Sequence, residues 1–376
     1  MIKIGFTGDF CPWLRVEKAF HNGNWQPLLD SVRPFFLQND LNVLDLECPL
    51  TTANTKISKT GPHIKAHPET AAMLNYLNCE LVATANNHFK DYDWEGMKET
   101  YETLEKHQIK WFGSGANLAE ASQTFYWKKD DTTIAFINVA ENEWTTTFGS
   151  EPGCHPIDTV SVFNQIQEAK SKADFIVVVA HGGHEHYNLP SPRMKKWYRF
   201  FVDAGASAVV THHTHIISGY EVYKDAPIFY SLGNFLFDWE GERNKPWNKG
   251  MIVRLHFEKA KPVTFEMEFV SHNNEEAGTY LLPEAEKEAI QNQLLLLNAI
   301  IADDEKLASA FQKYIETWKP VMNTWIQPYK GKYLPSLYKK GLLPSIISQN
   351  KKRLFTNLIR CEAHRDILIN SINPNL

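Results

Sequence analysis

Over residues 1 to about 180 the chain alternates short apolar runs with longer amphipathic stretches, and this alternation constrains the fold more than any other feature. Apolar runs of roughly four to eight residues between turn residues are typical of buried strands, and stretches with an apolar period of about 3.6 residues are typical of helices. Strands that alternate with helices along the chain indicate βα units. We therefore predict an α/β fold.

The pattern places each predicted element. Strands are expected at Ile2–Thr7, Leu41–Leu46, Leu81–Ala85, Thr133–Val139, Phe175–Ala180 and Ala208–Val210. Helices are expected at Pro27–Leu37, Pro68–Leu77, Trp94–His107, Val160–Lys172 and Arg193–Ala204. Four shorter runs follow, at Tyr220–Tyr223, Ile228–Leu232, Met251–Phe257 and Val263–Phe269, and they predict a second, more antiparallel sheet.

The chain changes character after residue 272, where a polar stretch gives way to a helical pattern. This change predicts a domain of residues 1–272 and a helical C-terminal extension of residues 273–376 that packs on it. Helices are expected at Pro283–Ile301, Glu305–Thr317 and Lys351–Ile369. The middle is expected to be broken by Pro320, Pro328, Pro335 and Pro344. Aromatic residues of the extension, among them Trp325 and Tyr333, are interpreted as packing onto the core or as a wall that stacks on a ligand.

Composition excludes several classes of protein. The chain is 43% hydrophobic and 22% charged, as ordinary globular proteins are. A formal net charge of -5 gives no reason to expect a nucleic-acid partner. No apolar run approaches the roughly 20 residues that span a bilayer, and no secretory signal precedes the first strand. Five scattered cysteines indicate a reducing compartment, so we expect a cytoplasmic protein.

Polar side chains follow five of the predicted strands. They are Asp9; Glu47; Asn86, Asn87 and His88; His181; and the cluster of His212, His213 and His215. In α/β sheets the ligand site lies where strands deliver their carboxyl ends, so these side chains are expected to meet.

Carboxylates, carboxamides and imidazoles together indicate a metal site, and their number exceeds what one tetrahedral ion takes. Two cations bridged by a carboxylate lower the pKa of a shared water, so that hydroxide is available at neutral pH. Each residue alone has another explanation: Asp9 as a turn cap, Asn86 and Asn87 as an Asx turn, and Glu47 as a surface carboxylate.

Several ordered blocks of sequence carry a resemblance. They are Gly8-Asp9, Leu46-Glu47-Cys48-Pro49-Leu50, Ala85-Asn86-Asn87-His88, His181-Gly182-Gly183-His184-Glu185, His212-His213-Thr214-His215 and Tyr230-Ser231-Leu232-Gly233-Asn234-Phe235-Leu236-Phe237-Asp238. With them the chain resembles the CapA family of poly-γ-glutamate capsule synthesis proteins, in the calcineurin-like metallophosphoesterase superfamily. The resemblance covers about residues 1–270.

The resemblance implies a four-layer α/β/β/α metallophosphoesterase-like sandwich with two divalent metal ions, such as Mn, Fe or Zn. The implied metal ligands are Asp9, Glu47, Asn87, His181, His213 and His215. It also implies that His88 is catalytic and assists the leaving group. The superfamily commonly has a histidine where this chain has Cys11, so Cys11 is either a thiolate ligand or an inert core thiol.

Further residues are expected to bind substrate or to support the ligands. They are Cys11, Asn86, His212, His184, Glu185, Asn234, Lys59, His364 and Arg365. Lys59 belongs to a basic loop that suits an anionic substrate, although a solvated loop is the alternative. His364 and Arg365 either reach over the pocket or lie on a charged solvent face.

Three functions fit these features. The first is a metal-dependent hydrolase of a phosphoester or other anionic substrate, small or polymeric, in capsule or surface-polymer metabolism. The second is a γ-glutamyl amide hydrolase or transferase. The third is a non-catalytic accessory protein that associates with the proteins of poly-γ-glutamate synthesis.

Overall fold

The computed structural model describes residues 1–372 and, within them, all side chains except those of residues 362, 366, 369 and 370. The chain divides into two compact units, Met1–Ala308 and Ser309–Leu376. The predicted domain boundary at residue 272 therefore falls inside the first unit. The packing of the extension on the core stays a prediction.

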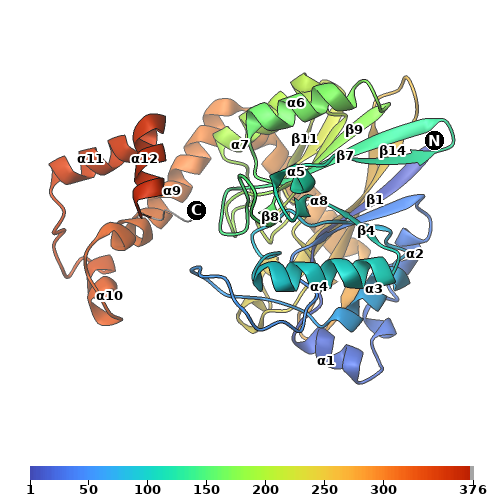
Figure 1. Cartoon of the computed structure of the whole chain (residues 1–376), viewed down its shortest axis with the longest axis horizontal. Helices are drawn as coiled ribbons and strands as arrows, with labels where there is room; N and C mark the ends of the chain where they lie inside the picture. The colour runs from blue at the N-terminus through green and yellow to red at the C-terminus, as the bar shows by residue number, and fades with distance from the viewer. Residues whose placement is uncertain (373–376) are drawn as a thin grey trace. The chain divides into compact units, whose positions relative to one another are not determined.

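Two sheets form the centre of the first unit (Figure 1). The first has the order β16 (Thr279–Leu281), β15 (Thr264–His272), β14 (Lys249–Phe257), β1 (Ile2–Cys11), β2 (Leu41–Leu46), β3 (Leu81–Ala83) and β4 (Lys110–Phe112), with β13 (Asn234–Phe237) also paired to β1. The second has the order β11 (Tyr220–Tyr223), β12 (Ala226–Phe229), β10 (Ala208–His212), β9 (Phe175–His181), β7 (Thr132–Ala140) and β6 (Phe125–Lys129). A small sheet pairs β5 (Ser114–Gly115) with β8 (Gly153–Cys154).

Helices cover both sides of this pair of sheets. Those of the first unit are α1 (Arg15–His21), α2 (Arg33–Phe36), α3 (Ala71–Tyr76), α4 (Asp93–Lys106), α5 (Leu118–Ala121), α6 (Thr159–Ala169), α7 (Pro192–Ala204) and α8 (Glu284–Ala302). Figure 1 shows α3 and α4 on one side of the stack and α6 and α7 on the other. The predicted four-layer α/β/β/α sandwich is confirmed.

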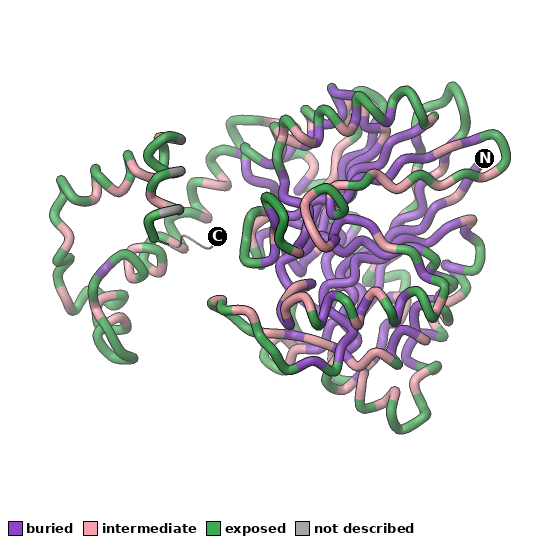
Figure 2. Tube along the Cα trace, viewed as in Figure 1, coloured by how far each residue is buried: buried purple, intermediate pink, exposed green. Residues whose placement is uncertain are grey.

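Aromatic side chains hold the two sheets together. Phe6 of the first sheet packs on Phe136 of the second, with ring centroids 6.4 Å apart, and Phe175 packs edge-on against Phe257 at 5.2 Å. Figure 2 shows the buried residues concentrated in the strands, as expected for sheets covered on both faces.

The helix boundaries follow local rules. In α7 the Ser191 side chain accepts a hydrogen bond from the Met194 amide, and Pro192 occupies the first turn. The helix ends at Gly205, whose φ of 128° is open to glycine at little steric cost. In α6 the Asp158 carboxylate accepts from the Ser161 amide in the same way.

The prediction of a separate antiparallel sheet is wrong. β11 and β12 extend the second sheet, whereas β14 and β15 run antiparallel beside β1 in the first. A two-residue period identifies a strand but does not specify its partner, so the sequence pattern left this pairing open.

The second unit is helical, and its elements begin at the end of the first. They are α9 (Asp304–Ile326), α10 (Tyr333–Lys339), α11 (Gln349–Arg360) and α12 (Glu362–Ile372). The predicted break at Pro320 is wrong, because α9 continues through it. A proline inside a helix removes one hydrogen bond and crowds the carbonyl four residues before it, which kinks or breaks a helix, and here the helix continues. Among the described residues, no helix is both long and apolar enough to cross a membrane.

Candidate metal centre

The candidate site lies at the carboxyl ends of four neighbouring strands. Asp9 on β1 stands opposite Asp45 on the parallel strand β2, and Glu47 follows two residues later. In the second sheet, His181 at the end of β9 stands opposite His212 at the end of β10. The strand ends of both sheets meet here, as the rule for α/β sheets predicts.

Two glycines allow the backbone to pack closely beneath Asp9. The Asp9 amide donates to the Gly233 carbonyl at 3.1 Å, and a Cβ on Gly8 would lie 1.8 Å from that oxygen. Gly233 itself has a φ of 70°. Any larger residue at position 8 would push β1 off the 231–234 loop, which explains the Gly8-Asp9 block.

The two histidines after β10 have strained backbones. His213 has a φ of 95° and His215 a φ of 60°, in a region that residues other than glycine adopt rarely. Such residues cost on the order of 1–3 kcal/mol each and cluster at functional sites. The turn brings His213 and His215 to the same cluster.

Carboxylates and imidazoles form three overlapping groups. In each group the potential ligand atoms lie within 4.8 Å of one another; the groups are Glu47, His181 and His213; Asp9, Glu47 and His215; and Asp9, Asp45 and His181. Glu47 belongs to two groups. Its two oxygens lie 3.5 Å from His181 Nε2 and 3.8 Å from His215 Nδ1.

Two carboxamides complete the cluster. Asn87 Oδ1 lies 3.1 Å from His181 Nε2, and Asn234 Oδ1 lies 2.9 Å from His215 Nδ1. Each amide oxygen therefore faces an imidazole of a different group, and these three-residue groups are called triads below.

The carboxylates are buried without adequate partners. Asp9 Oδ1 and all four carboxylate oxygens of Asp45 and Glu47 have no hydrogen-bond partner in the structure, and the three residues are at most 1% exposed. Buried polar atoms are nearly always satisfied, and buried charges are paired or coordinate metals. The donor set of carboxylate oxygens and imidazole nitrogens fits divalent cations such as Zn, Mn or Fe.

The electrostatics of the cluster favour the binding of positive charge. Burial raises the pKa of Glu47 to about 8, although His215 opposes this shift. Burial would lower the pKa of His215, but Glu47 and Asp9 raise it to about 9. Without cations, protons would neutralise these groups. Metal binding would displace those protons, since ligands bind in their deprotonated forms.

Beside the cluster, His88 belongs to a buried hydrogen-bonded group. Its Nδ1 lies 2.7 Å from Asp91 Oδ2, and Asp91 also pairs with the Lys59 ammonium and accepts from the Ile64 amide at 2.9 Å. Burial lowers the pKa of His88, although Asp91 opposes this shift. A proton on Nδ1 is shared with Asp91, which leaves Nε2 as the nitrogen for a reacting group.

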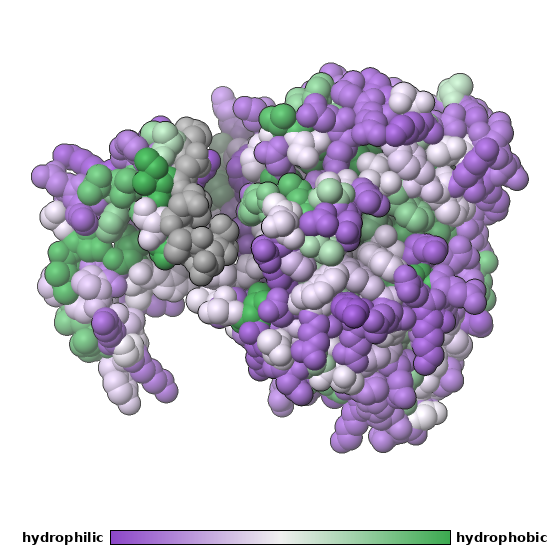
Figure 3. Space-filling view, viewed as in Figure 1, coloured by the Kyte–Doolittle hydropathy of each residue, from purple (hydrophilic) through white to green (hydrophobic). Residues whose placement is uncertain are grey.

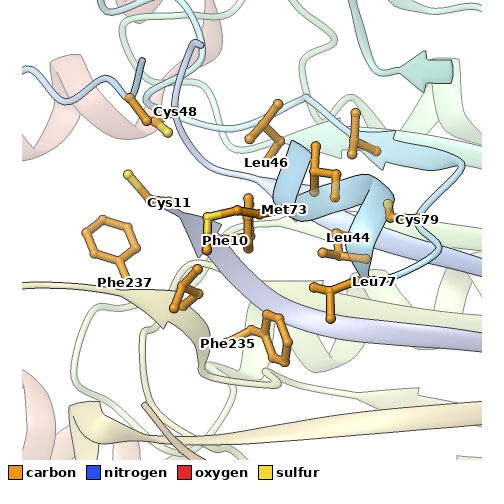
Figure 4. Packing of buried hydrophobic residues seen from close by; sticks show 14 of the residues in the cluster. Phe10, Cys11, Leu44, Leu46, Cys48, Met73, Leu77, Cys79, Phe235 and Phe237 are labelled. Atoms are coloured by element: carbon orange, nitrogen blue, oxygen red, sulfur yellow. The ribbon is translucent and has the colours of Figure 1, made fainter. Parts of the chain in front are cut away.

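Cys11 lies in the hydrophobic core. It is fully buried beside Phe10, its thiol faces Cys48, and burial raises its pKa well above the usual value (Figure 4). A thiol with a raised pKa is a poor ligand, because thiolate is the binding form. Of the two predicted roles for Cys11, this environment favours the inert thiol.

The other predicted residues fall into different places. Asn86 is buried, donates to the Leu46 carbonyl and accepts from the His88 amide, so it shapes the loop that carries Asn87. The His212 Nε2 lies 2.7 Å from the Thr7 carbonyl and ties β10 to β1. His184 is half-buried and Glu185 exposed, in the loop after His181.

His364 and Arg365 lie on α12, in the second unit. Their predicted approach to the pocket stays a prediction.

Three residues of the site were not predicted. Asp45 Oδ2 lies 3.3 Å from His181 Nδ1, Glu143 Oε1 lies 3.7 Å from His213 Nε2, and the Trp247 ring lies 4.3 Å from that of His215. Asp45 carried a signal in the sequence: it precedes Glu47, just past the end of β2, by two residues, and in an extended chain residues two apart lie on the same face. Glu143 and Trp247 come from loops without a comparable pattern.

A cavity of the first unit is lined by none of the residues of the three groups. Its volume is about 860 Å³, and its lining includes His186, whose ring lies 5.6 Å from that of Trp247. Ile216, Leu294 and Leu297 form part of an apolar wall, and Asn188 and Asn248 are among its polar groups. The size is in the range of small-molecule sites.

A family model decides the relationship of this chain. The model for the bacterial capsule synthesis protein PGA_cap matches residues 3–239, which include strands of both sheets and every residue of the three groups. The chain belongs to the PGA_cap family. This membership confirms the predicted CapA relationship.

Relatives in the family carry related names. The chain is 31% identical over 272 residues to the PGA biosynthesis protein CapA of Bacillus subtilis, covering 71% of this chain and 70% of that protein. It is 30% identical over 264 residues to the capsule biosynthesis protein CapA of Bacillus anthracis, covering 68% and 64%. It is 25% identical over 216 residues to a probable polyglutamine synthesis accessory protein of Mycobacterium tuberculosis, covering 54% and 57%.

Solved structures are more distant. A phosphatase from Mycoplasma pneumoniae shares 14% identity with a TM-score of 0.44, covering 73% of this chain and 95% of that chain. A hypothetical protein from Thermus thermophilus shares 14% identity with a TM-score of 0.46, covering 75% and 100%.

Proposed function

We propose that this member of the PGA_cap family is a metal-dependent hydrolase of a phosphoester or another anionic substrate in capsule or surface-polymer metabolism. One observation carries the proposal: two buried carboxylate–imidazole triads share Glu47, and both of its carboxylate oxygens lack hydrogen-bond partners. A carboxylate shared by two triads is consistent with a site for two cations.

The residues divide between two cation positions. Glu47, His181 and His213, with Asn87, would hold one cation, and Asp9, Glu47 and His215 would hold the other. Two bound divalent cations supply hydroxide at neutral pH and neutralise charge on the group that is transferred. Asp45, 3.3 Å from His181 Nδ1, would fix the orientation of that imidazole toward the cation.

His88 would handle the leaving group. Asp91 holds its Nδ1, so Nε2 is free to hydrogen-bond with the departing oxygen or to protonate it. The ammonium of Lys59 lies 3.2 Å from His88 Nδ1 and adds positive charge that suits an anionic substrate.

The direct test is activity of the protein reconstituted with Mn, Fe or Zn on generic phosphomonoesters and phosphodiesters. We expect turnover with at least one ion, and a fall of about 100-fold or more in His88→Ala, since general acid catalysis contributes roughly that much. Absence of turnover with every ion, in protein shown to be folded, would count against the hydrolase.

The names of the relatives favour a second candidate, the cleavage or transfer of a γ-glutamyl amide. The same two-metal arrangement serves amides as well as phosphates, and the fold does not choose between them. Release of glutamate oligomers from a γ-linked polymer, with no turnover of phosphoesters, would favour it.

The word accessory in one relative's name supports a third candidate, a non-catalytic protein of polymer synthesis. Co-purification with a polymer ligase, together with normal polymer production by cells that carry the Asn87→Ala variant, would favour this candidate over both enzymes.

A further inference from the structure

Charge is divided unequally between the two units. Residues 309–376 contain eleven lysines and arginines and three acidic residues, a formal charge of +8. The whole chain carries -5, so residues 1–308 carry -13. The net charge of the chain conceals a strongly basic segment. A segment of this charge has affinity for an anionic partner.

The second unit also leaves its apolar side chains in solvent. Among its described side chains, only Gln327 is buried. Trp325 is 70% exposed, Tyr333 77% and Ile359 63%. Figure 3 shows apolar side chains gathered on the face of this unit that it views. Large exposed apolar surface on a soluble chain marks an interaction site.

Helix α11 separates the two kinds of side chain most clearly. At 100° per residue, its four large apolar residues lie on one arc, and most of its cationic and amide side chains lie on the opposite one. The apolar arc consists of Leu354, Phe355, Leu358 and Ile359, and the polar arc includes Lys352, Arg353 and Arg360. Lys351 lies at the apolar arc with its Nζ 5.5 Å from the Phe355 ring centroid, where a long side chain can extend its charge toward water.

These features identify the partner by its chemistry. A dissolved polyanion would pair with the lysines and leave Trp325, Leu354 and Ile359 in water. An anionic lipid surface offers negative charge and a continuous apolar layer together.

We propose that residues 309–372 bind the surface of an anionic bilayer, with the apolar arc of α11 at the acyl boundary and its cations among the headgroups. Exposed tryptophan and tyrosine side chains suit the same boundary, because they are amphipathic. This inference does not depend on the proposed hydrolase activity, since none of the residues involved belongs to the metal cluster.

Co-sedimentation of the full chain with vesicles tests the proposal. We expect binding to phosphatidylcholine vesicles that contain phosphatidylglycerol, weak binding to phosphatidylcholine alone, and release at high salt. Charge reversal in Lys351→Glu/Lys352→Glu/Arg353→Glu should reduce partitioning at least about 100-fold, because each cation near the surface contributes roughly fivefold. Leu354→Ser/Ile359→Ser should also reduce it, with the charge unchanged.

Matched variants on the first unit provide the controls. Lys98→Glu/Lys106→Glu/Lys196→Glu makes the same change of charge, and Leu295→Ser/Leu296→Ser removes two exposed leucines of α8. Both controls should bind as the natural chain does. The proposal is overturned by a lack of binding to anionic vesicles or by equal losses in the test and control variants. It is also overturned if poly-γ-glutamate or DNA abolishes vesicle binding at concentrations too low to screen the vesicle charge, because the second unit would then prefer a dissolved polyanion.

Discussion

The two units of this chain stabilise themselves in different ways. Residues 1–308 bury a dense core, both between the two sheets and between each sheet and its helices. Their net charge is negative. The described part of residues 309–376 is helical and basic and buries no apolar side chain. Burial of apolar surface is the main favourable term in folding. The first unit can therefore hold a strained, charged cluster, whereas the described part of the second has no comparable apolar core.

The largest difference is expected in the cost of removing an apolar side chain. Phe136→Ala deletes a fully buried ring that contacts Phe6 and should cost about 3–5 kcal/mol of unfolding free energy. Leu354→Ala removes a side chain that is 45% exposed on α11 and should cost no more than about 0.5 kcal/mol. Denaturant unfolding followed by circular dichroism measures both. Equal costs would show that the second unit has a packed core after all.

The next prediction concerns the charge shared by the two triads. Glu47→Gln removes the carboxylate but keeps its shape, and should lower hydrolysis about 100- to 1000-fold, as the loss of a preorganised electrostatic group does. Burial raises the pKa of Glu47 to about 8, so glutamine resembles its protonated form at neutral pH. The metal-free variant should unfold at nearly the natural temperature. Divalent ions should raise the Tm of the natural chain but not that of the variant.

Glu143 offers a comparison with Glu47, because it lies near the triads without belonging to any of them. Glu143 lies 3.7 Å from His213 but belongs to none of the three groups. Glu143→Gln should lower activity less than about tenfold and retain the metal-induced shift in Tm, since it changes only a peripheral contact. If Glu143→Gln loses the shift and Glu47→Gln keeps it, the assignment of ligands is wrong.

Much of the candidate site could be anticipated from the sequence. Asp9, Glu47, Asn87, His181 and His213 all follow apolar runs, and the strands of an α/β sheet bring their carboxyl ends together. Their position was therefore fixed once the strands were recognised. Which of them bind metal stays a prediction.

Other features depend on tertiary structure that no local pattern encodes. Trp247 contacts His215 from the segment that connects β13 to β14, and both of these strands pair with β1. The pairing of the later strands was predicted wrongly for the same reason, because period identifies strands and not partners. The helix through Pro320 differs again: a proline weakens a helix interior, but it can kink a helix without ending it.

Acid stability should also follow the first unit. Burial lowers the pKa of His155 and of His272 to about 4, while an unfolded histidine titrates near 6.5. Between these values the unfolded chain binds more protons, so stability is fully present above pH 6.5 and falls as the pH drops to 4. Each histidine contributes at most about 3 kcal/mol to this loss.

The variant His155→Gln isolates one of these contributions. It removes the titrating group but retains a donor for the Asn138 carbonyl, which lies 2.9 Å from Nδ1. Its unfolding free energy should vary less between pH 6.5 and 4 than that of the natural chain. An unchanged pH dependence, measured by denaturant unfolding across this window, would contradict the assignment.

A smaller effect than at Glu47 is expected at Asp91, which positions His88 rather than touching the substrate. Asp91→Asn weakens the hold on His88 Nδ1 and should lower kcat about 10- to 100-fold, the range for residues that support ligands and catalytic groups, with KM and the metal-induced Tm shift nearly unchanged. Because Asp91 would act through His88, the double variant His88→Ala/Asp91→Asn should be no slower than His88→Ala alone. Losses that multiply fully would show that Asp91 acts independently, through its pairing with Lys59.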